Sequence, residues 1–287
     1  MVAKSLAIAL AFLAIPASAR GSDSTPDAPL RWDEDRPRFR TGEYALTLLT
    51  GVEAIAMYYE VPPTRHPHWT GGILFDDAVR NALRVRSPGA LRFVWTAADV
   101  LDSAEVAITV GIDSFLVPLL RGSSDVAWQV TWMDLESYAL DSIVTFALYD
   151  SVGRARPNYA DCQRDPSLFD NCSTSPTASF PSGHVSEAFM TAGLSCANHG
   201  YLPLYGSPLL DALACARDVT LGTVDGLLRI MGDRHYATDV IAGAGLGFAF
   251  GYGVPVFLHY TARRARPSLA VAPLVGQRVG LGVTGLF

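Results

Sequence analysis

A long uncharged segment near the end of the chain limits what this sequence can fold into. Residues 240–262 contain no Asp, Glu, Lys or Arg and are long enough to cross a bilayer as one helix. Apolar segments of helical length recur along the chain between polar or proline-containing turns. They cover residues 43–60, 103–121, 127–149, 184–199, 208–224 and 238–260. This pattern predicts an all-α fold, a helical bundle of six or more helices.

Composition divides the chain into four parts. They are a signal peptide (1–19), a polar leader (20–42), a helical domain (43–262) and a C-terminal tail (263–287). The signal peptide is predicted from Lys4, the apolar run 5–15 and the Ala-x-Ala site that ends at Ala19. An uncleaved anchor helix is the alternative. A cleaved signal predicts export to the periplasm.

The segments on either side of the helical domain have different patterns. Pro26, Pro29 and Pro37 interrupt the leader and predict a flexible or extended segment. In the tail, apolar residues such as Val283 alternate with small or polar ones, which is typical of β-strands. Gly276 is placed for a hairpin turn between two such stretches. A short β-like tail is therefore predicted after the helices.

The cysteine content indicates an oxidising compartment. The chain has 4 cysteines, and an exported protein commonly holds such an even set in disulfides. Cys162 and Cys172 bracket one polar loop, whereas Cys196 and Cys215 lie on successive helical segments. We predict that each of these two neighbouring sets forms a disulfide, although four cysteines allow other pairings.

Overall composition excludes some classes of partner. The chain is 49% hydrophobic and only 17% charged, with a formal net charge of −6. Because it has no polybasic face, the protein is not expected to bind nucleic acid. No cluster of histidine, cysteine and carboxylate residues has the pattern of a metal site, so no metal is predicted. The sequence does not specify an oligomeric state.

Acidic residues within the apolar segments bear on whether the helices cross a membrane. Charges at this frequency are costly at bilayer depth. We therefore favour a periplasmic bundle, free or membrane-associated, with these residues at helix surfaces or in polar contacts. The alternative is a membrane-embedded bundle whose uncleaved signal helix keeps the cysteine loop on the oxidising side. The residues are Glu105, Asp113, Asp134, Glu136 and Asp141.

Two residues close to the last apolar segment have the spacing of a catalytic pair. His235 and Asp239 are four positions apart, so on a helix they share a face and their side chains can touch. A carboxylate that accepts a hydrogen bond from one ring nitrogen leaves the lone pair of the other nitrogen free. His235 is therefore a candidate nucleophile and Asp239 its orienting partner. On its own, this spacing is more typical of a structural His–Asp pair.

Donors for a phosphate group occur at three other places. The motif Pro-Ser-Gly-His, which ends at His184, opens a helix whose free N–H groups and positive dipole end favour an anion. Ser182 adds a hydroxyl donor, and Gly183 lets a phosphate approach the backbone closely. Arg156 and Arg229 carry rigid guanidinium forks that match phosphate oxygens. His184 is then placed to protonate a leaving alkoxide.

The order of these motifs resembles that of the type 2 phosphatidic acid phosphatase family. Arg156-Pro157 comes first, Pro-Ser-Gly-His second, and Arg229-x5-His235-x3-Asp239 third. That family shares its fold and anion pocket with bacterial class A acid phosphatases and vanadium-dependent haloperoxidases. The motifs lie within residues 156–239, and the resemblance implies an acid phosphatase/vanadium haloperoxidase-like bundle over about residues 43–262.

The resemblance implies a role for each matched residue. His235 would attack phosphorus and form a phosphohistidine, with Asp239 orienting it. His184 would protonate the leaving group and later activate water. The phosphoryl oxygens and the transition-state charge would be held by Arg156, Ser182, Gly183 and Arg229. This scheme requires neither a metal nor another cofactor.

Two positions depart from the family pattern. The first motif has a lysine seven positions before its arginine, where this chain has Tyr149. Arg154 is a candidate replacement for that charge, but it lies on a different side if the helix continues. Leu228 stands where the third motif commonly has serine. Loss of the lysine removes one phosphate contact but leaves the nucleophile, its orienting carboxylate and the acid in place.

The sequence favours an exported phosphatase that acts on phosphate monoesters or lipid phosphates. A vanadate-dependent haloperoxidase is one alternative, and the absent lysine counts against it because an oxyanion cofactor must be held throughout turnover. A non-catalytic phosphate-binding envelope protein is another, and Tyr149 is its motivation. The sequence does not specify which phosphate ester is the substrate.

Overall fold

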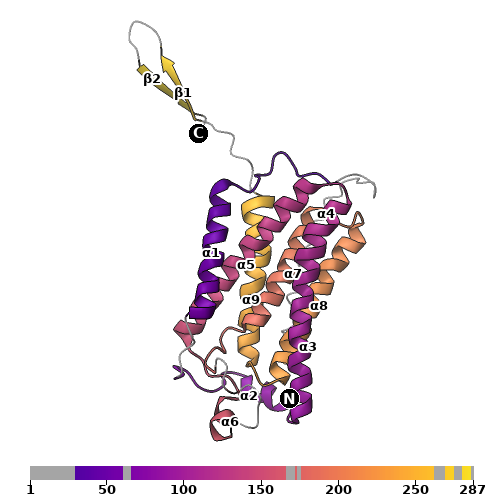
Figure 1. Cartoon of the computed structure of the whole chain (residues 1–287), viewed down its shortest axis with the longest axis vertical. Coiled ribbons are helices and arrows are strands. Elements are labelled where there is room, and N and C mark those ends of the chain that lie inside the picture. Colours follow the sequence, from indigo (N-terminus) through magenta and orange to yellow (C-terminus); the bar gives the residue numbers. More distant parts are fainter. Residues whose placement is uncertain are drawn as a thin grey trace.

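The computed structural model describes residues 30–60, 66–165, 172, 176–261, 269–274 and 280–285. The predicted signal peptide, the first part of the leader and the predicted turn at Gly276 lie outside these residues. Within them the main body is an elongated bundle of long helices that run side by side (Figure 1). The all-α bundle predicted from the sequence is confirmed.

Six long helical rods form the bundle in the described part of the chain. They are α1 (Thr41–Glu60), α3 (Pro88–Val106) continued by η2 (Ala107–Leu116) and α4 (Val117–Leu120), α5 (Ser124–Val152), α7 (Gly183–Tyr201), α8 (Pro208–Met231), and α9 (Ala237–Val254) continued by η4 (Pro255–Tyr260). Two short helices, α2 (Asp76–Leu83) and α6 (Tyr159–Arg164), lie in connections at one end of the bundle (Figure 1). The apolar segment 103–121 is the second part of a longer rod, since no glycine or proline interrupts residues 90–107.

The tail contains two short strands. β1 (Leu269–Leu274) and β2 (Gly280–Gly285) pair antiparallel, with Leu269 opposite Gly285 and Leu274 opposite Gly280. The period of two that the sequence has in this region corresponds to this ladder.

Local sequence explains where several of the rods begin and end. Ser87, Ser123 and Ser207 each accept a hydrogen bond from a first-turn N–H of α3, α5 and α8, respectively. At the other end of α5, Gly153 adopts a left-handed conformation with φ 55° and ψ 41°. That conformation favours glycine and ends the helix. The chain then turns towards Arg156, which belongs to the candidate site.

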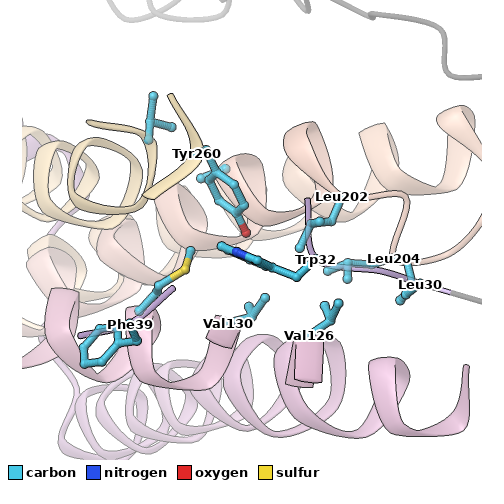
Figure 2. Close-up of a cluster of buried hydrophobic side chains, with 11 residues drawn as sticks. Leu30, Trp32, Phe39, Val126, Val130, Leu202, Leu204 and Tyr260 are labelled. Atoms are coloured by element: carbon cyan, nitrogen blue, oxygen red, sulfur yellow. The ribbon is translucent and has the colours of Figure 1, made fainter. Parts of the chain in front are cut away.

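The second half of the leader packs against the bundle. Leu30, Trp32 and Phe39 are at most 6% exposed and join a hydrophobic cluster with Val130 of α5 and Tyr260 of η4 (Figure 2). The leader was predicted to be flexible or extended. Because residues 30–39 pack against the bundle, the flexible alternative is wrong for them. Proline spacing indicated only that the segment is not helical, and the apolar side chains between the prolines determine where it lies.

Helices α7 and α9 approach each other closely along a row of glycines. A Cβ atom added at Gly243, Gly247 or Gly251 would lie 2.4, 1.8 or 1.9 Å from a carbonyl oxygen of α7 or of the residue that precedes it. Larger residues at these positions would push the two backbones apart. The prediction that Gly243 and Gly247 serve close helix contact is confirmed. This packing fixes the start of α9 against the start of α7.

Both predicted disulfides are present. Cys162 of α6 is bonded to Cys172, with their Cα atoms 5.4 Å apart. Cys196 of α7 is bonded to Cys215 of α8, with their Cα atoms 4.4 Å apart. The bonds link neighbouring segments of the chain, and they are consistent with an oxidising compartment.

The helices direct their charges inward and much of their apolar surface outward. On α8, Leu209, Leu213 and Leu227 are 67%, 53% and 45% exposed, whereas Asp218 and Asp225 are completely buried. This arrangement is the reverse of that in a water-soluble bundle. Two rods, Pro88–Leu120 and Ala237–Tyr260, are long and apolar enough to cross a membrane, and only 28% of the apolar window of each is buried.

The acidic residues that the sequence placed inside apolar segments face the interior. None of them lies at a helix surface, which was one of the two predicted positions. Four have polar partners within the described part of the chain, such as Arg217 for Asp113 and His259 for Glu136. The buried residues are Glu105, Asp113, Asp134, Glu136 and Asp141. Their inward orientation removes the main objection to a membrane-embedded bundle, because the charges would not meet lipid.

Candidate active site

A cavity of about 670 Å³ opens among α1, α3, α5, α7 and α8. Four of the seven predicted site residues line it: Arg156, Gly183, His184 and Arg229. The other three connect to these four. His235 contacts Arg156, Ser182 precedes Gly183, and the backbone N–H of Ser182 donates to the carbonyl of Asp239 over 3.0 Å. The structure thus brings together all the residues that the motifs predicted.

The start of α7 presents donors to this cavity. Ser182 is the residue before the helix, and its backbone has the extended conformation of an N-cap. A cap hydroxyl normally accepts a hydrogen bond from the first turn of its helix. The Ser182 hydroxyl does not do so, and it is buried without a hydrogen-bond partner among the described residues. A buried polar group in this condition is costly unless a ligand satisfies it.

Two arginines approach the same place from different helices. Arg156 follows the end of α5, and its Nη1 donates to the carbonyl of Arg234 over 3.2 Å. Arg229, near the end of α8, is 5% exposed. Its Nη1 lies 2.9 Å from Asp99 and its Nε lies 3.3 Å from Asp225. Its Nη2 has no partner in the part of the chain that is described, although it is buried. This nitrogen is a second unsatisfied donor at the cavity.

The hydrogen bonds of His235 define its tautomer. Its Nδ1 lies 2.8 Å from the carbonyl oxygen of Ser179, which can only accept a hydrogen bond. Its Nε2 lies 3.1 Å from Nη1 of Arg156, which can only donate. The proton is therefore on Nδ1, and Nε2 carries the lone pair. Burial and the Arg156 charge hold the pKa of His235 well below its usual value, so the ring is neutral.

Asp239 reaches His235 through Ser179. Its Oδ2 accepts from the Ser179 hydroxyl over 2.7 Å and from the Tyr236 N–H over 2.8 Å. No direct Asp239–His235 hydrogen bond occurs among the described residues, so the contact expected from the four-residue spacing is not formed. The spacing rule applies only within a helix, and α9 begins at Ala237, after His235. The carbonyl of Ser179 therefore takes the place expected for the carboxylate.

His184 occupies the first turn of α7 and faces the cavity. Its side chain is 45% exposed, and its Nε2 lies 3.9 Å from Asp99 of α3. Loss of bulk water and the charges of Arg229, Arg156 and Arg234 lower the pKa of His184 to about 3. The ring is therefore neutral in the empty site. An anion bound to the arginines would cancel their effect and raise this pKa.

Comparisons with known proteins identify the family of this region. The family profile described as PAP2 superfamily matches residues 132–266, which include all three motifs. Residues 132–266 belong to the PAP2 superfamily. Among solved structures, this chain is similar to the "first transmembrane PAP2 type phosphatidylglycerolphosphate phosphatase from Bacillus subtilis", with 17% identity, a TM-score of 0.48, and 75% of this chain and 94% of that chain covered. A comparison with curated proteins gives no match.

In this PAP2 domain, Tyr149 fills the space beside the start of α7. A Cβ atom added at Gly183 would lie 2.0 Å from the Tyr149 hydroxyl oxygen. A larger residue at position 183 would therefore displace the Tyr149 hydroxyl from the start of α7. Tyr149 also lines the cavity. A neutral donor thus stands where the family pattern has a positive charge.

Arg154 supports the PAP2 site from behind and does not replace the missing lysine. It is completely buried and forms ion pairs with Asp76 and Asp239. Its guanidinium lies 4.0 Å from the ring centroid of Trp69 and 4.2 Å from that of Tyr236. The expectation of a different side assumed that the helix continues, but α5 ends at Val152 and Arg154 lies beyond it. It joins α2, the first motif and α9 in one buried network.

Sequence reasoning missed two residues of the PAP2 cavity. Arg234 lines it and lies 4.2 Å from the ring of Trp95, so a third guanidinium adds to the positive charge. Asp99 of α3 pairs with Arg229 and faces His184. The position of Arg234 next to His235 was an available signal. Asp99 had none, because it lies 130 positions before Arg229 in the chain.

Proposed function

We propose that this protein is a phosphatase that transfers the phosphoryl group of a phosphate ester first to His235 and then to water. One observation carries the proposal: the lone pair of His235 Nε2 faces Arg156, which lines the cavity, and two donors in or next to the cavity wall are buried without partners among the described residues. The donors are the Ser182 hydroxyl and Nη2 of Arg229. An oxyanion would satisfy all of these groups at once. The PAP2 superfamily match supports the same chemistry.

In the first step, the phosphate of the substrate binds in the positive pocket. Arg156 exchanges its contact with His235 for a phosphoryl oxygen, and Arg229 and Ser182 bind further oxygens. The freed Nε2 then attacks phosphorus. The N–P bond forms while the P–O bond to the alcohol breaks. His184 donates a proton to the departing oxygen. Ser179 holds the opposite ring nitrogen throughout.

In the second step, water releases the phosphate. His184, now neutral, takes a proton from the water, whose oxygen attacks phosphorus as the N–P bond breaks. Inorganic phosphate leaves and His235 recovers its neutral tautomer. A bound dianion offsets the guanidinium charges, which together with burial lower the pKa of His184, and the ring takes up from solvent the proton that it donates. Binding of the substrate thus favours protonation of His184, the general acid.

We infer that this phosphatase is exported and works within a membrane. The inward charges and outward apolar side chains of α8 support a bundle surrounded by lipid. The cavity lies at one end of the bundle, within reach of a lipid headgroup. The Cys162–Cys172 disulfide belongs to that same end, and it supports an extracytoplasmic location for the site. Lipid phosphates are therefore the first substrates to test, with small phosphate esters beside them.

A phosphate-release assay on the detergent-purified protein tests the proposal. We expect release from a lysophospholipid monophosphate or from a soluble aryl phosphate, and loss of that release in His235→Ala. Equal release by the wild type and His235→Ala would contradict the mechanism. Tight phosphate binding without turnover would favour a non-catalytic phosphate-binding protein. Halide oxidation with added vanadate and peroxide, in place of phosphate release, would favour the haloperoxidase.

A further inference from the structure

The wall of the cavity carries carboxylates beyond the phosphate site. Asp141 of α5 and Glu187 of α7 both line it. Asp141 is 4% exposed and accepts a hydrogen bond from the Ser186 hydroxyl over 2.7 Å. Glu187 accepts one from the hydroxyl of Tyr138. These partners are neutral.

Several buried carboxylates elsewhere in the bundle have basic partners. Glu136 lies 2.9 Å from His259 and Asp211 lies 2.7 Å from His199. Asp113 and Asp218 both contact Arg217. Among the described residues, no Lys, Arg or His nitrogen lies within 4.0 Å of the Asp141 or Glu187 carboxylate. Among the described residues, Glu105 and Asp134 also lack such a partner, but they do not line the cavity, whereas Asp141 and Glu187 do.

A second observation indicates that this wall is a binding surface. Thr145 lies between Tyr149 and Asp141 on α5, one turn from each. It is 3% exposed and lines the cavity, and its hydroxyl has no hydrogen-bond partner among the described residues. A polar atom that is buried, unsatisfied and faces a cavity requires a ligand atom or water. Three oxygen-bearing side chains thus follow the cavity away from the phosphate site.

We propose that the substrate is a phosphate ester whose alcohol carries a protonated amine, and that Asp141 and Glu187 bind the ammonium group. This inference rests on the proposed function, since it takes the phosphate to lie at His235. Glu187 is four residues from Gly183, and Asp141 is eight from Tyr149. At 1.5 Å per residue, Ser186, which donates to the Asp141 carboxylate, and Glu187 lie about 4.5 Å and 6 Å along α7 from Gly183. Thr145 contacts the linker between the two charged groups.

A matched series of soluble substrates tests this assignment. The ω-aminoalkyl phosphates are compared with alkyl and ω-hydroxyalkyl phosphates of the same length. Linkers of about three to nine methylene groups cover the required span, because an extended chain gains about 1.2 Å per bond. We expect kcat/KM to be about tenfold or more higher for the amine at the best length, which is the effect of one charged hydrogen bond. Equal values for the three compounds at every length would overturn the proposal.

Substitutions on the cavity wall separate binding of the amine from a structural role. In Glu187→Gln and Asp141→Asn, the preference for the amine should fall towards unity while kcat/KM for the alkyl phosphate changes little. Equal losses of kcat/KM for the aminoalkyl and the alkyl phosphate would contradict a role of these carboxylates in substrate choice. Glu53→Gln is the matched control, because Glu53 is exposed on α1 outside the cavity and loses the same charge.

A binding measurement keeps this inference distinct from the proposed function. Should no phosphate ester be turned over, the proposed function fails, and calorimetry on His235→Ala still compares the aminoalkyl phosphate with its alkyl counterpart. Tighter binding of the amine, lost in Glu187→Gln, would support the ammonium site on its own. Equal binding of the two compounds would reject it.

Discussion

Two buried histidines at opposite ends of the bundle have different surroundings. His235 and His259 are both 1% exposed. At the end opposite the cavity, Nε2 of His259 lies 2.9 Å from Glu136, and its ring stacks on Phe39 with a centroid distance of 5.5 Å. At the cavity, the two ring nitrogens of His235 face a carbonyl and a guanidinium. The Glu136 carboxylate accepts a hydrogen bond from Nε2 of His259, whereas the guanidinium beside Nε2 of His235 can only donate one, so that nitrogen is unprotonated.

The difference teaches that burial alone does not distinguish a structural histidine from a nucleophile. What distinguishes them is whether neighbouring groups are already satisfied. Glu136 satisfies His259, and Phe39 closes the space around it. Beside His235, the Ser182 hydroxyl and one nitrogen of Arg229 are buried without partners among the described residues. Unsatisfied donors next to a free lone pair describe a site that awaits an anion.

Replacing each histidine by alanine should show most clearly that His235 and His259 have different roles. His235→Ala should lower kcat/KM by a factor of about a thousand or more, because the nucleophile is lost, with little change in the melting temperature. His259→Ala should leave Glu136 buried without a partner and cost about 3–5 kcal/mol of stability. The fraction of His259→Ala that remains folded should retain phosphatase activity. Phosphate release and thermal unfolding of both variants check this, and a reversed pattern would contradict it.

Glycine substitutions on α9 extend the comparison to packing. Gly243→Ala meets the Ser182 carbonyl and Gly251→Ala meets the Met190 carbonyl, so each should cost about 1–3 kcal/mol of stability. Gly243→Ala should also lower kcat/KM about a hundredfold, because it displaces the start of α7. Gly245→Ala is the control, since open space surrounds that position. Similar activity losses in the first two variants would argue against a link between Gly243 and the site.

Removing the Ser179 hydroxyl should test the indirect role of Asp239. Ser179→Ala keeps the carbonyl that accepts from His235 but loses the bond to the carboxylate. We expect kcat to fall about tenfold with KM unchanged, as one charged hydrogen bond would predict. Steady-state kinetics check this. Full activity in Ser179→Ala would show that Asp239 acts on α9 alone, as the capping residue of its first turn.

Tyr149→Phe should have a smaller effect. The hydroxyl beside Gly183 is a neutral group, so its loss should raise KM by about threefold to tenfold without changing the chemistry. Inhibition by inorganic phosphate should weaken by the same factor. An unchanged inhibition constant would mean that the hydroxyl only fills space.

The pH profile should show the smallest effect. Because the pKa of His235 is held well below its usual value, the nucleophile stays neutral as the pH falls through about 6.5. After correction for the ionisation of the substrate near pH 6, kcat/KM should therefore not fall between pH 7 and pH 5.5 through protonation of the nucleophile. A fall in kcat/KM towards low pH that fits one protonation with a pKa near 6.5 would indicate an ordinary histidine. It would contradict a neutral His235 whose proton is on Nδ1.

The fold and the set of site residues were largely predictable from the sequence, because they depend on local or ordered patterns. Apolar segments of helical length predicted the rods. The order of the three motifs predicted that Arg156, His184 and His235 converge, and the structure places Arg156 and His184 at one cavity with His235 against Arg156. Nearby cysteines also predicted the two disulfides. Each of these inferences needed only spacing along the chain.

The contacts that depend on tertiary structure were not predictable. The Asp239–His235 contact was inferred from helical spacing, but His235 precedes the helix, and Ser179 lies between the two side chains. The inward orientation of Asp141 could not be read from its apolar segment, since α5 is surrounded on several sides. Asp99 reached the site only through the packing of α3 against α8. Long-range packing determined all three.

Trapping the reaction intermediate tests the central claim most directly. The protein is mixed with a substrate labelled in its phosphoryl group, quenched in alkali within milliseconds, digested, and mapped by mass spectrometry. We predict label on Nε2 of His235, absent from His235→Ala and persistent when His184 is replaced by alanine and an activated aryl phosphate is used. Label on another residue, or steady turnover with no labelled protein at any time, would contradict the account.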